Sequence, residues 1–368
     1  MYFQKKELMV KRKRFLGRLF RGFIFLLNLI AIIALLASYA STYISPVKIW
    51  HFAFFGIAYP YILIVNVLFC IFWVLFKPKF LFFSLIPIFI GFGYIGSYYQ
   101  LKSKETDATG IVVCSYNIKN FQNIPGERKE TAVKILNYLR DKNAGIICIQ
   151  EMTNPPLNSF NPFPPDSTGR FPEFFTTYKG SVTEPAVYSL HRIINEGKIQ
   201  FSKSTSMIVF ADLKINNDTI RVYSCHMQSY HITEDEINYL DSLNIDGDKA
   251  QNIRHFRKIA SKMKNAFIKR ATHSEQLRDS IMKSPYPVIV CGDFNDTPVS
   301  YTYHTMKKVL KDAFVESGKG MGNTYQGKLP SFRIDYIFHD RLFDAYSFHV
   351  DKVNYSDHYP VNCLLRLK

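Results

Sequence analysis

The feature that most constrains the fold of this chain is a series of three long apolar runs near its N-terminus. The runs cover about residues 22–43, 51–76 and 80–98. A helix of about 20 apolar residues is long enough to cross the hydrocarbon core of a membrane. The sequence therefore predicts an all-α bundle of three transmembrane helices over residues 21–100.

A basic arm, residues 1–20, precedes the first run and contains the cluster Lys11–Arg14. A basic start followed by an apolar core is also typical of a secretory signal peptide, but the two further runs favour a membrane anchor. Positively charged loops tend to stay in the cytoplasm, and Lys77 and Lys79 lie in the tight turn between the second and third runs. We therefore expect a multi-pass protein of the cell (inner) membrane with a cytoplasmic N-terminus. Everything beyond a short linker, residues 101–109, is expected outside the cytoplasm.

The positive charge of the chain belongs mainly to this membrane part. Residues 1–104 contain 13 of the 46 Lys and Arg but one of the 30 Asp and Glu, which accounts for +12 of the formal net charge of +16. The rest of the chain carries +4. A part so close to neutral gives little support for nucleic-acid binding.

The cysteines predict neither a disulfide framework nor a zinc site. Cys70 lies within the second apolar run, each of the other five lies in a strand-like run, and no Cys-x-x-Cys occurs. Buried free thiols behave as small hydrophobic side chains, so we expect these residues to serve packing.

Beyond residue 110, apolar strand-like runs end in polar side chains of the kind that build active sites. The clearest run, Val288–Cys291, is followed by Gly292, Asp293 and Asn295. Side chains two apart on a strand share a face, so Asp293 and Asn295 are expected to project together beyond the sheet. Other apolar runs lead in the same way into Asn117, Glu151, His226 and Asp335, and the pair Asp357–His358 precedes the last strand. Such a set predicts an active site at one end of a sheet scaffold.

Strand-like and helix-like segments alternate in this region. Residues 128–142 have helical apolar spacing between two predicted strands, and residues 248–284 form a longer helical stretch with a basic face. Short strand-like runs lie between these helices, at residues 186–190, 198–201, 207–213 and 219–225. The pattern predicts an α/β layer architecture. We interpret the basic face as a solvated helix surface, with binding to anionic lipid or nucleic acid as the alternative.

These motifs, in this order, resemble those of the endonuclease/exonuclease/phosphatase superfamily. The matching segments are Ser115–Ile118, Gln150–Glu151, His226, Gly292–Asn295, Arg333–Tyr336 and Ser356–Val361. The superfamily includes pancreatic-type deoxyribonucleases, abasic-site endonucleases, neutral sphingomyelinases and inositol-polyphosphate 5-phosphatases. The resemblance implies a catalytic domain over residues 110–368 with a deoxyribonuclease I-like fold. This fold is a four-layer α/β sandwich, in which two face-to-face β-sheets are flanked by helices.

The residue types predict a site for a hard divalent cation. Glu151, Asn117 and Asp357 offer oxygen ligands, which suit Mg²⁺, with Mn²⁺ as the alternative. The resemblance makes Glu151 the principal ligand. Some members of the superfamily carry an acid two residues after the Asn117 position, where this chain has Lys119, so a second metal-ligand group is in doubt.

The remaining motif residues are expected to carry the acid–base chemistry. An imidazole titrates near neutrality, which makes His358 the preferred general base, and the resemblance implies that Asp335 orients it. Asp293 is expected as a second acid–base or water-positioning carboxylate, and which of Asp293 and His358 removes the water proton stays open at this point. Asn295 and His226 are expected to bind the phosphate, and His226 also to assist the departing oxygen.

These features predict a membrane-tethered, metal-dependent phosphodiesterase or phosphatase. Water would attack phosphorus, and lipid head groups or other small phosphate esters are the preferred substrates. The sequence after His226, Met-Gln-Ser, is nearer to the phosphatases and sphingomyelinases than to the abasic-site endonucleases. The alternatives are an extracytoplasmic nuclease and a catalytically silent binding module, and the full set of motif residues argues against the second alternative.

Overall fold

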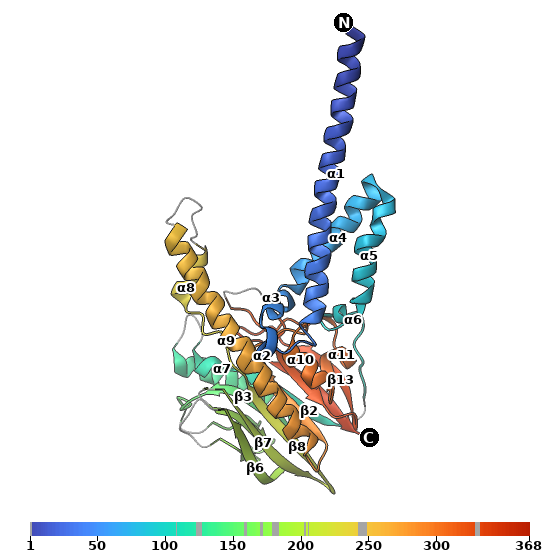
Figure 1. Cartoon of the computed structure of the whole chain (residues 1–368). Helices are drawn as coiled ribbons and strands as arrows, with labels where there is room; N and C mark the ends of the chain where they lie inside the picture. The colour runs from blue at the N-terminus through green and yellow to red at the C-terminus, as the bar shows by residue number, and fades with distance from the viewer. Residues whose placement is uncertain are drawn as a thin grey trace.

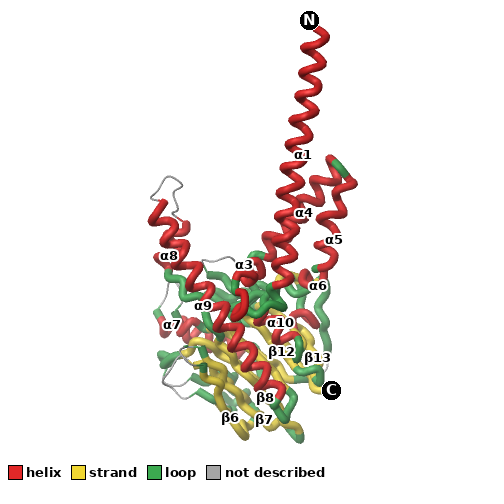
Figure 2. Tube along the Cα trace, in the orientation of Figure 1, coloured by secondary structure: helices red, strands yellow, loops and turns green. Residues whose placement is uncertain are grey.

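The computed structural model places two six-stranded sheets face to face below a group of N-terminal helices (Figure 1). It describes residues 2–107, 109–122, 127–157, 160–169, 172–178, 184–201, 204, 206–241, 249–327 and 332–368. The four-layer α/β sandwich that the sequence predicts is therefore confirmed. The tube view in Figure 2 separates the sheets from the helices that rise above them.

The first sheet has the strand order β13-β14-β2-β3-β5-β4. Its strands are β2 (Ile111–Asn117), β3 (Ile146–Met152), β4 (Phe175–Thr176), β5 (Glu184–Ser189), β13 (Phe343–Val350) and β14 (Val361–Leu367). The second sheet has the order β10-β12-β9-β8-β7-β6. Its strands are β6 (Arg192–Gln200), β7 (Met207–Ile215), β8 (Asp218–His226), β9 (Val288–Asp293), β10 (Lys311–Asp312) and β12 (Asp335–His339). Strand β6 is longer than expected because it lies at a sheet edge, where its polar residues meet solvent.

Alternation along each strand builds the layers. Val113 and Ile289 face the core between the sheets, while their neighbours Cys114 and Val290 face outward against helices. Helix α7 (Arg128–Asp141) covers the outer face of the first sheet, and α9 (Lys249–Met282) and α10 (Tyr301–Lys307) cover the second. The remaining short elements of this part are η2 (Lys119–Phe121), α8 (Glu234–Asp241) and α11 (Ala313–Ser317).

The N-terminal helices differ from three continuous spans. The elements are α1 (Tyr2–Ala40), α2 (Pro46–Ile49), α3 (His51–Ile57), α4 (Tyr59–Phe76), η1 (Pro78–Phe80), α5 (Leu81–Ile90) and α6 (Phe92–Ile95). Two helical segments, Gly17–Ala40 and Tyr59–Phe76, have the length and apolar composition to cross a membrane.

Proline and glycine explain where the other predicted spans break. Pro60 has no N–H for the carbonyl four residues earlier, so the second run divides at Ala58 into α3 and α4. In the third run, Pro87 lies within α5, and this helix ends at Gly91. A side chain at Gly91 would lie 2.0 Å from the Tyr39 ring, so glycine permits this close contact between α1 and α5.

The helices pack directly on the domain that contains the two six-stranded sheets. The hydroxyl of Ser41 donates to the Val299 carbonyl at 3.4 Å, and a side chain at Gly56 would lie 2.4 Å from the same oxygen. After α6, strand β1 (Tyr99–Gln100) pairs with β11 (Gly320–Met321). The domain of the two six-stranded sheets therefore lies against the base of the helices.

Candidate active site

The polar strand ends meet at the sheet edge that faces the N-terminal helices. Strands β2 and β3 are parallel, as are β8 and β9, so Asn117, Glu151, His226 and Asp293 reach the same edge. Asp335 is paired with Asp293 across antiparallel strands. The expectation that a strand runs into Asp335 was wrong. Asp335 begins β12 instead, and the antiparallel direction brings this first residue to the same edge.

The tip of β9 is shaped by two residues with positive φ. Gly292 has φ 138°, and a Cβ there would lie 2.0 Å from the Cys225 carbonyl oxygen, so the position requires glycine. Asn295 has φ 53°, its backbone N–H donates to Asp293 Oδ1 at 2.7 Å, and its side-chain amide donates to Asp293 Oδ2 at 3.1 Å. The turn thus holds the Asp293 carboxylate from both of its oxygens.

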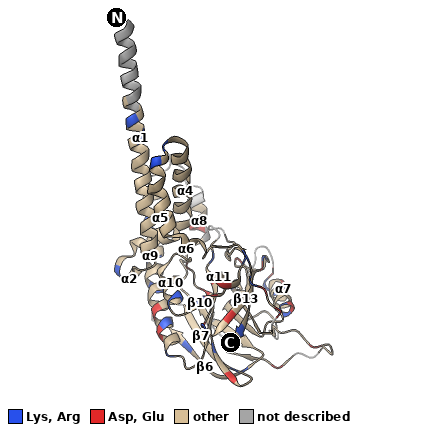
Figure 3. Ribbon diagram, turned by 90° about the vertical axis from the view of Figure 1, so that its right-hand side faces the viewer, with Lys and Arg blue, Asp and Glu red and all other residues tan. Residues whose placement is uncertain are grey.

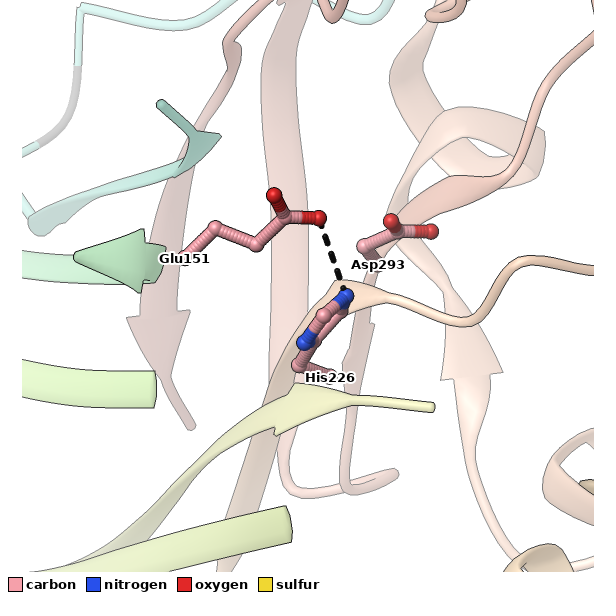
Figure 4. Close-up of side chains that lie close together, drawn as sticks. All are labelled: Glu151, His226 and Asp293. Carbon is pink, nitrogen blue, oxygen red and sulfur yellow. Dashed lines mark ion pairs between the residues drawn. The ribbon is translucent and has the colours of Figure 1, made fainter. Parts of the chain in front are cut away.

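Side chains from the two sheets meet beside Asp293. His226 Nε2 lies 3.1 Å from Glu151 Oε1, and Figure 4 shows both side chains pointing toward Asp293. The amide of Asn117 donates to Glu151 Oε1 and to Asp293 Oδ2, each at 3.0 Å. Ligand atoms of Glu151, His226 and Asp293 lie within 4.8 Å of one another. The polar side chains at the ends of β2, β3, β8 and β9 therefore lie together.

His358 bridges two carboxylates in the same region. Its Nδ1 lies 2.9 Å from Asp335 Oδ2, and its Nε2 lies 3.8 Å from Asp293 Oδ2. All three side chains are buried. The Asp335 contact fixes the orientation of the ring and leaves Nε2 directed toward Asp293.

Burial and charge set the protonation of these groups. Burial raises the pKa of Asp293 to about 6, against the opposing effect of His358. Burial acts to lower the pKa of His358, but Asp335 and Asp293 outweigh it and raise that pKa to about 10. Burial acts to raise the pKa of Glu151, but His226 outweighs it and the pKa falls to about 2. Glu151 in turn raises the pKa of His226 above its usual value, against the effect of burial. At neutral pH, Glu151 is an anion and His358 a cation.

Asp357 has a different surrounding from the other predicted ligands. Its Oδ2 lies 2.8 Å from the ammonium of Lys119. Among the described residues it belongs to neither of the two groups of close metal-binding side chains. It does line the same pocket as Glu151 and His358. Lys119, which the sequence marked only as a departure from the superfamily pattern, is therefore part of the site.

The donor set fits a hard divalent cation. Glu151 supplies a charged carboxylate, and Asp293 supplies a second carboxylate nearby. Asn117 turns its amide nitrogen toward both carboxylates, and its amide oxygen accepts from the backbone N–H of Lys119 at 3.1 Å. Carboxylate and amide oxygens are ligands that Mg²⁺, Mn²⁺ and Ca²⁺ accept.

The site opens into a pocket with a volume of about 460 Å³. Sequence reasoning missed most of its wall. Tyr325 packs edge-on against the His358 ring, with centroids 5.4 Å apart, and no motif marked it. Ile57, Ala58 and Tyr61, from the α3–α4 junction, also line the pocket. The only signal for them in the sequence was the Pro60 break, which does not indicate what the junction faces.

Comparisons with known proteins agree with this geometry. A family model described as "Endonuclease/Exonuclease/phosphatase family" matches residues 114–358, and one described as a domain of unknown function matches residues 21–98. No curated protein matches the chain.

Several solved structures are similar in fold. Humanized D. rerio TDP2 carrying 14 mutations shares 12% identity, covering 70% of this chain and 100% of that chain, with a TM-score of 0.51. An endonuclease/exonuclease/phosphatase family protein from Leptotrichia buccalis shares 17% identity, with the same coverage and a TM-score of 0.47. A mannosyl-6-phosphatase from Bacteroides thetaiotaomicron shares 16% identity. The match covers 70% of this chain and 100% of that chain, with a TM-score of 0.47. The family model spans more than half of the chain, and the predicted resemblance is confirmed: the protein belongs to the endonuclease/exonuclease/phosphatase family, whose members are hydrolases acting on phosphoesters.

Proposed function

We propose that the protein is a membrane-anchored, divalent-metal-dependent phosphoester hydrolase that uses water to attack phosphorus. The observation that carries the proposal is the contact among Asn117, Glu151 and Asp293, with His358 held beside them by Asp335. This arrangement combines anionic oxygen ligands, a buried acid–base pair and hydrogen-bond donors on one pocket wall.

Glu151 and Asn117 would hold the cation, with Asp357 as the third proposed oxygen donor. We propose Mg²⁺, with Mn²⁺ as the alternative, because these oxygen donors suit hard cations. When bound, the cation supplies charge neutralisation at the phosphate and at the leaving oxygen.

The chain's own side chains carry the proton transfers. Asp293 accepts the proton of the attacking water as the new phosphorus–oxygen bond forms. His226 donates a proton to the leaving oxygen as the old bond breaks. The raised pKa of Asp293 and the imidazolium form of His358 support this choice of proton acceptor. His358 then contacts the phosphate as a donor. Asn295, whose amide donates to Asp293 Oδ2 and to the Met227 carbonyl, holds the Asp293 carboxylate in place.

Membrane anchoring is supported by two helices of sufficient length and by the position of the basic residues. In Figure 3, the turn between α4 and α5 carries positive charge at the end of the helices away from the sheets. This turn contains Lys77 and Lys79. We propose that α1, α4 and the α5–α6 segment pass through the cell (inner) membrane, with the turn and the N-terminus in the cytoplasm. The catalytic domain then lies outside the cytoplasm against the bilayer, where lipid head groups and small phosphate esters reach it.

Hydrolysis by the purified full-length protein tests this proposal. The protein in lipid nanodiscs is assayed against phospholipid, inositol phosphate, nucleotide and plasmid DNA, before and after EDTA and with Mg²⁺ or Mn²⁺ restored. Metal-dependent hydrolysis of a phospholipid or small ester supports the proposal. Chelator-resistant activity, or none on any substrate, contradicts it, and cleavage of DNA alone supports the nuclease alternative.

A further inference from the structure

The pocket has a catalytic wall and an apolar wall. Glu151, Asp293 and His358 form part of the first wall. Another part is lined by side chains from the α3–α4 junction, from α8 and from α9, namely Ile57, Ala58, Tyr61, Ile237, Ile259 and Met263. A phosphate needs only the catalytic wall, so the apolar wall points to a substrate with an apolar part.

The apolar wall continues along one face of α9. Ile253, Phe256, Ile259 and Met263 follow a helical spacing of three or four residues, so they form a stripe. Ile259 is 7% exposed, whereas Ile253 and Phe256, nearer the start of the helix, are 50% and 49% exposed. The stripe therefore runs from an exposed helix end into the pocket. Exposed large apolar side chains beside basic ones are typical of a helix that contacts a membrane surface.

Helices α3 and α9 touch on the side of the two sheets, and α4 and α9 separate away from them. Phe54 of α3 and Phe267 of α9 are in edge-to-face contact, with ring centroids 5.1 Å apart. Beyond this contact, α9 and α4 diverge in Figure 1. Figures 1 and 3 both place α8 at the height of α5, which is the level of the membrane-type helices.

We propose that the substrate is a phosphoester bearing a long hydrocarbon chain, which lies in the part of the pocket lined by the α3–α4 junction and the stripe of α9. This inference rests on the proposed function, because the phosphate end is placed at the catalytic wall. The substrate enters sideways from the outer leaflet, with its chain leaving the bilayer along the stripe. Each CH₂ group that passes from water into the bilayer and the pocket favours association roughly fourfold, so chain length becomes a determinant of activity.

A series of phosphodiesters that differ only in chain length tests the proposal. Methyl, octyl and hexadecyl 4-nitrophenyl phosphates are supplied to the full-length protein in nanodiscs with Mg²⁺, and the corresponding alkyl phosphates serve as monoesters. We expect kcat/KM to rise about tenfold or more from methyl to hexadecyl. Equal rates along both series would overturn the proposal.

Two substitutions test where the hydrocarbon chain of the substrate lies. Ala58→Trp fills this part of the pocket and Met263→Glu places a charge in it, so each is expected to reduce the hexadecyl-to-methyl ratio of kcat/KM by about tenfold. Met282→Glu is the matched control, because Met282 lies at the far end of α9 and is 69% exposed. The control should keep the wild-type ratio. Unchanged ratios in both Ala58→Trp and Met263→Glu would contradict the assigned location.

A readout that does not need hydrolysis separates this inference from the proposed function. A phospholipid with a diazirine on the acyl-chain carbons nearest the head group is incorporated into the nanodiscs and photoactivated. Cross-links are expected within residues 57–61 and 259–263. Cross-links there without any hydrolysis would refute the proposed function and leave the chain site standing. Hydrolysis without cross-links in either segment would refute the chain site alone.

Discussion

The ammonium of Lys119 lies 2.8 Å from Asp357, one of the three predicted metal ligands. The two residues are far apart in sequence, and both are partly exposed, at 33% and 23%. A cation beside a metal ligand opposes metal binding, since it neutralises the carboxylate that the metal would use. Lys119 therefore places a positive charge beside Asp357, at the position where some superfamily members carry an acid.

Removal of this ammonium is expected to strengthen metal binding. Lys119→Met frees Asp357, and the Mg²⁺ dissociation constant should fall about fivefold, the equivalent of about 1 kcal/mol for a partly exposed pair. Calorimetric titration of the EDTA-treated protein measures the change. Lys142→Met is the control, because Lys142 pairs with Asp351 at 2.5 Å in another part of the domain. Weaker Mg²⁺ binding in Lys119→Met would show that the ammonium supports the site.

The Asp335–His358 contact is expected to act as a unit. Asp335→Asn removes the charge that orients and stabilises the imidazolium, so kcat should fall about 10²-fold or more. The double variant Asp335→Asn/His358→Asn should lose little beyond the larger single effect. Asp344→Asn, at a carboxylate that pairs with Lys368 at 3.3 Å on β13, is the matched control. Multiplicative losses in the double variant would mean that the two residues act independently.

Gly292→Ala is expected to destabilise the fold and not merely the site. The methyl group would lie 2.0 Å from the Cys225 carbonyl at a φ of 138°. Backbone strain of this kind costs about 1–3 kcal/mol, and the contact adds to it. Gly169→Ala separates the two causes, because Gly169 has φ 79° and no heavy atom within 4 Å of the added carbon. Urea unfolding should show the larger loss at Gly292, and equal losses would contradict the close contact.

The acid sensitivity of stability is expected to depend on His273. This side chain is buried against Phe201, with ring centroids 3.7 Å apart, and burial lowers its pKa to about 4. The unfolded chain takes up the proton near pH 6.5, whereas the folded chain does so only near pH 4, so stability falls between these values as pH decreases.

Replacement of the imidazole tests this dependence. The lost stability amounts to roughly 3 kcal/mol when pH drops through the whole window. His273→Phe should lose much less than wild type between pH 7 and pH 4, as measured by urea unfolding. His349→Phe, at an exposed residue of β13, is the control. The same acid dependence in wild type and His273→Phe would contradict the assignment.

Much of the site was predictable because strand ends obey local rules. Apolar runs that end in Asn117, Glu151, His226 and Asp293 converge once their strands pair, and the structure places these side chains beside one another. Short apolar runs lie on both sides of Asp335, so the sequence does not indicate whether a strand ends or begins at this residue. Two-residue strands such as β4 and β10 leave no periodicity at all.

Contacts between distant segments account for the rest. The pattern of residues 51–76 indicates an apolar helix but not that its break at Ala58 faces the catalytic pocket. Such a contact depends on how Gly56 packs against Val299, and nothing local to either residue indicates the other. The Lys119–Asp357 pair is unpredictable for the same reason.

The position of a bound Mn²⁺ ion tests the central claim most directly. Crystals of the full-length protein grown with MnCl₂ are measured near the manganese absorption edge, so that anomalous scattering marks the ion. The account predicts a peak about 2.0–2.6 Å from a carboxylate oxygen of Glu151, in contact with the pocket that His358 lines. An ion bound elsewhere, with no peak at Glu151 in protein that hydrolyses phosphoesters, would contradict it.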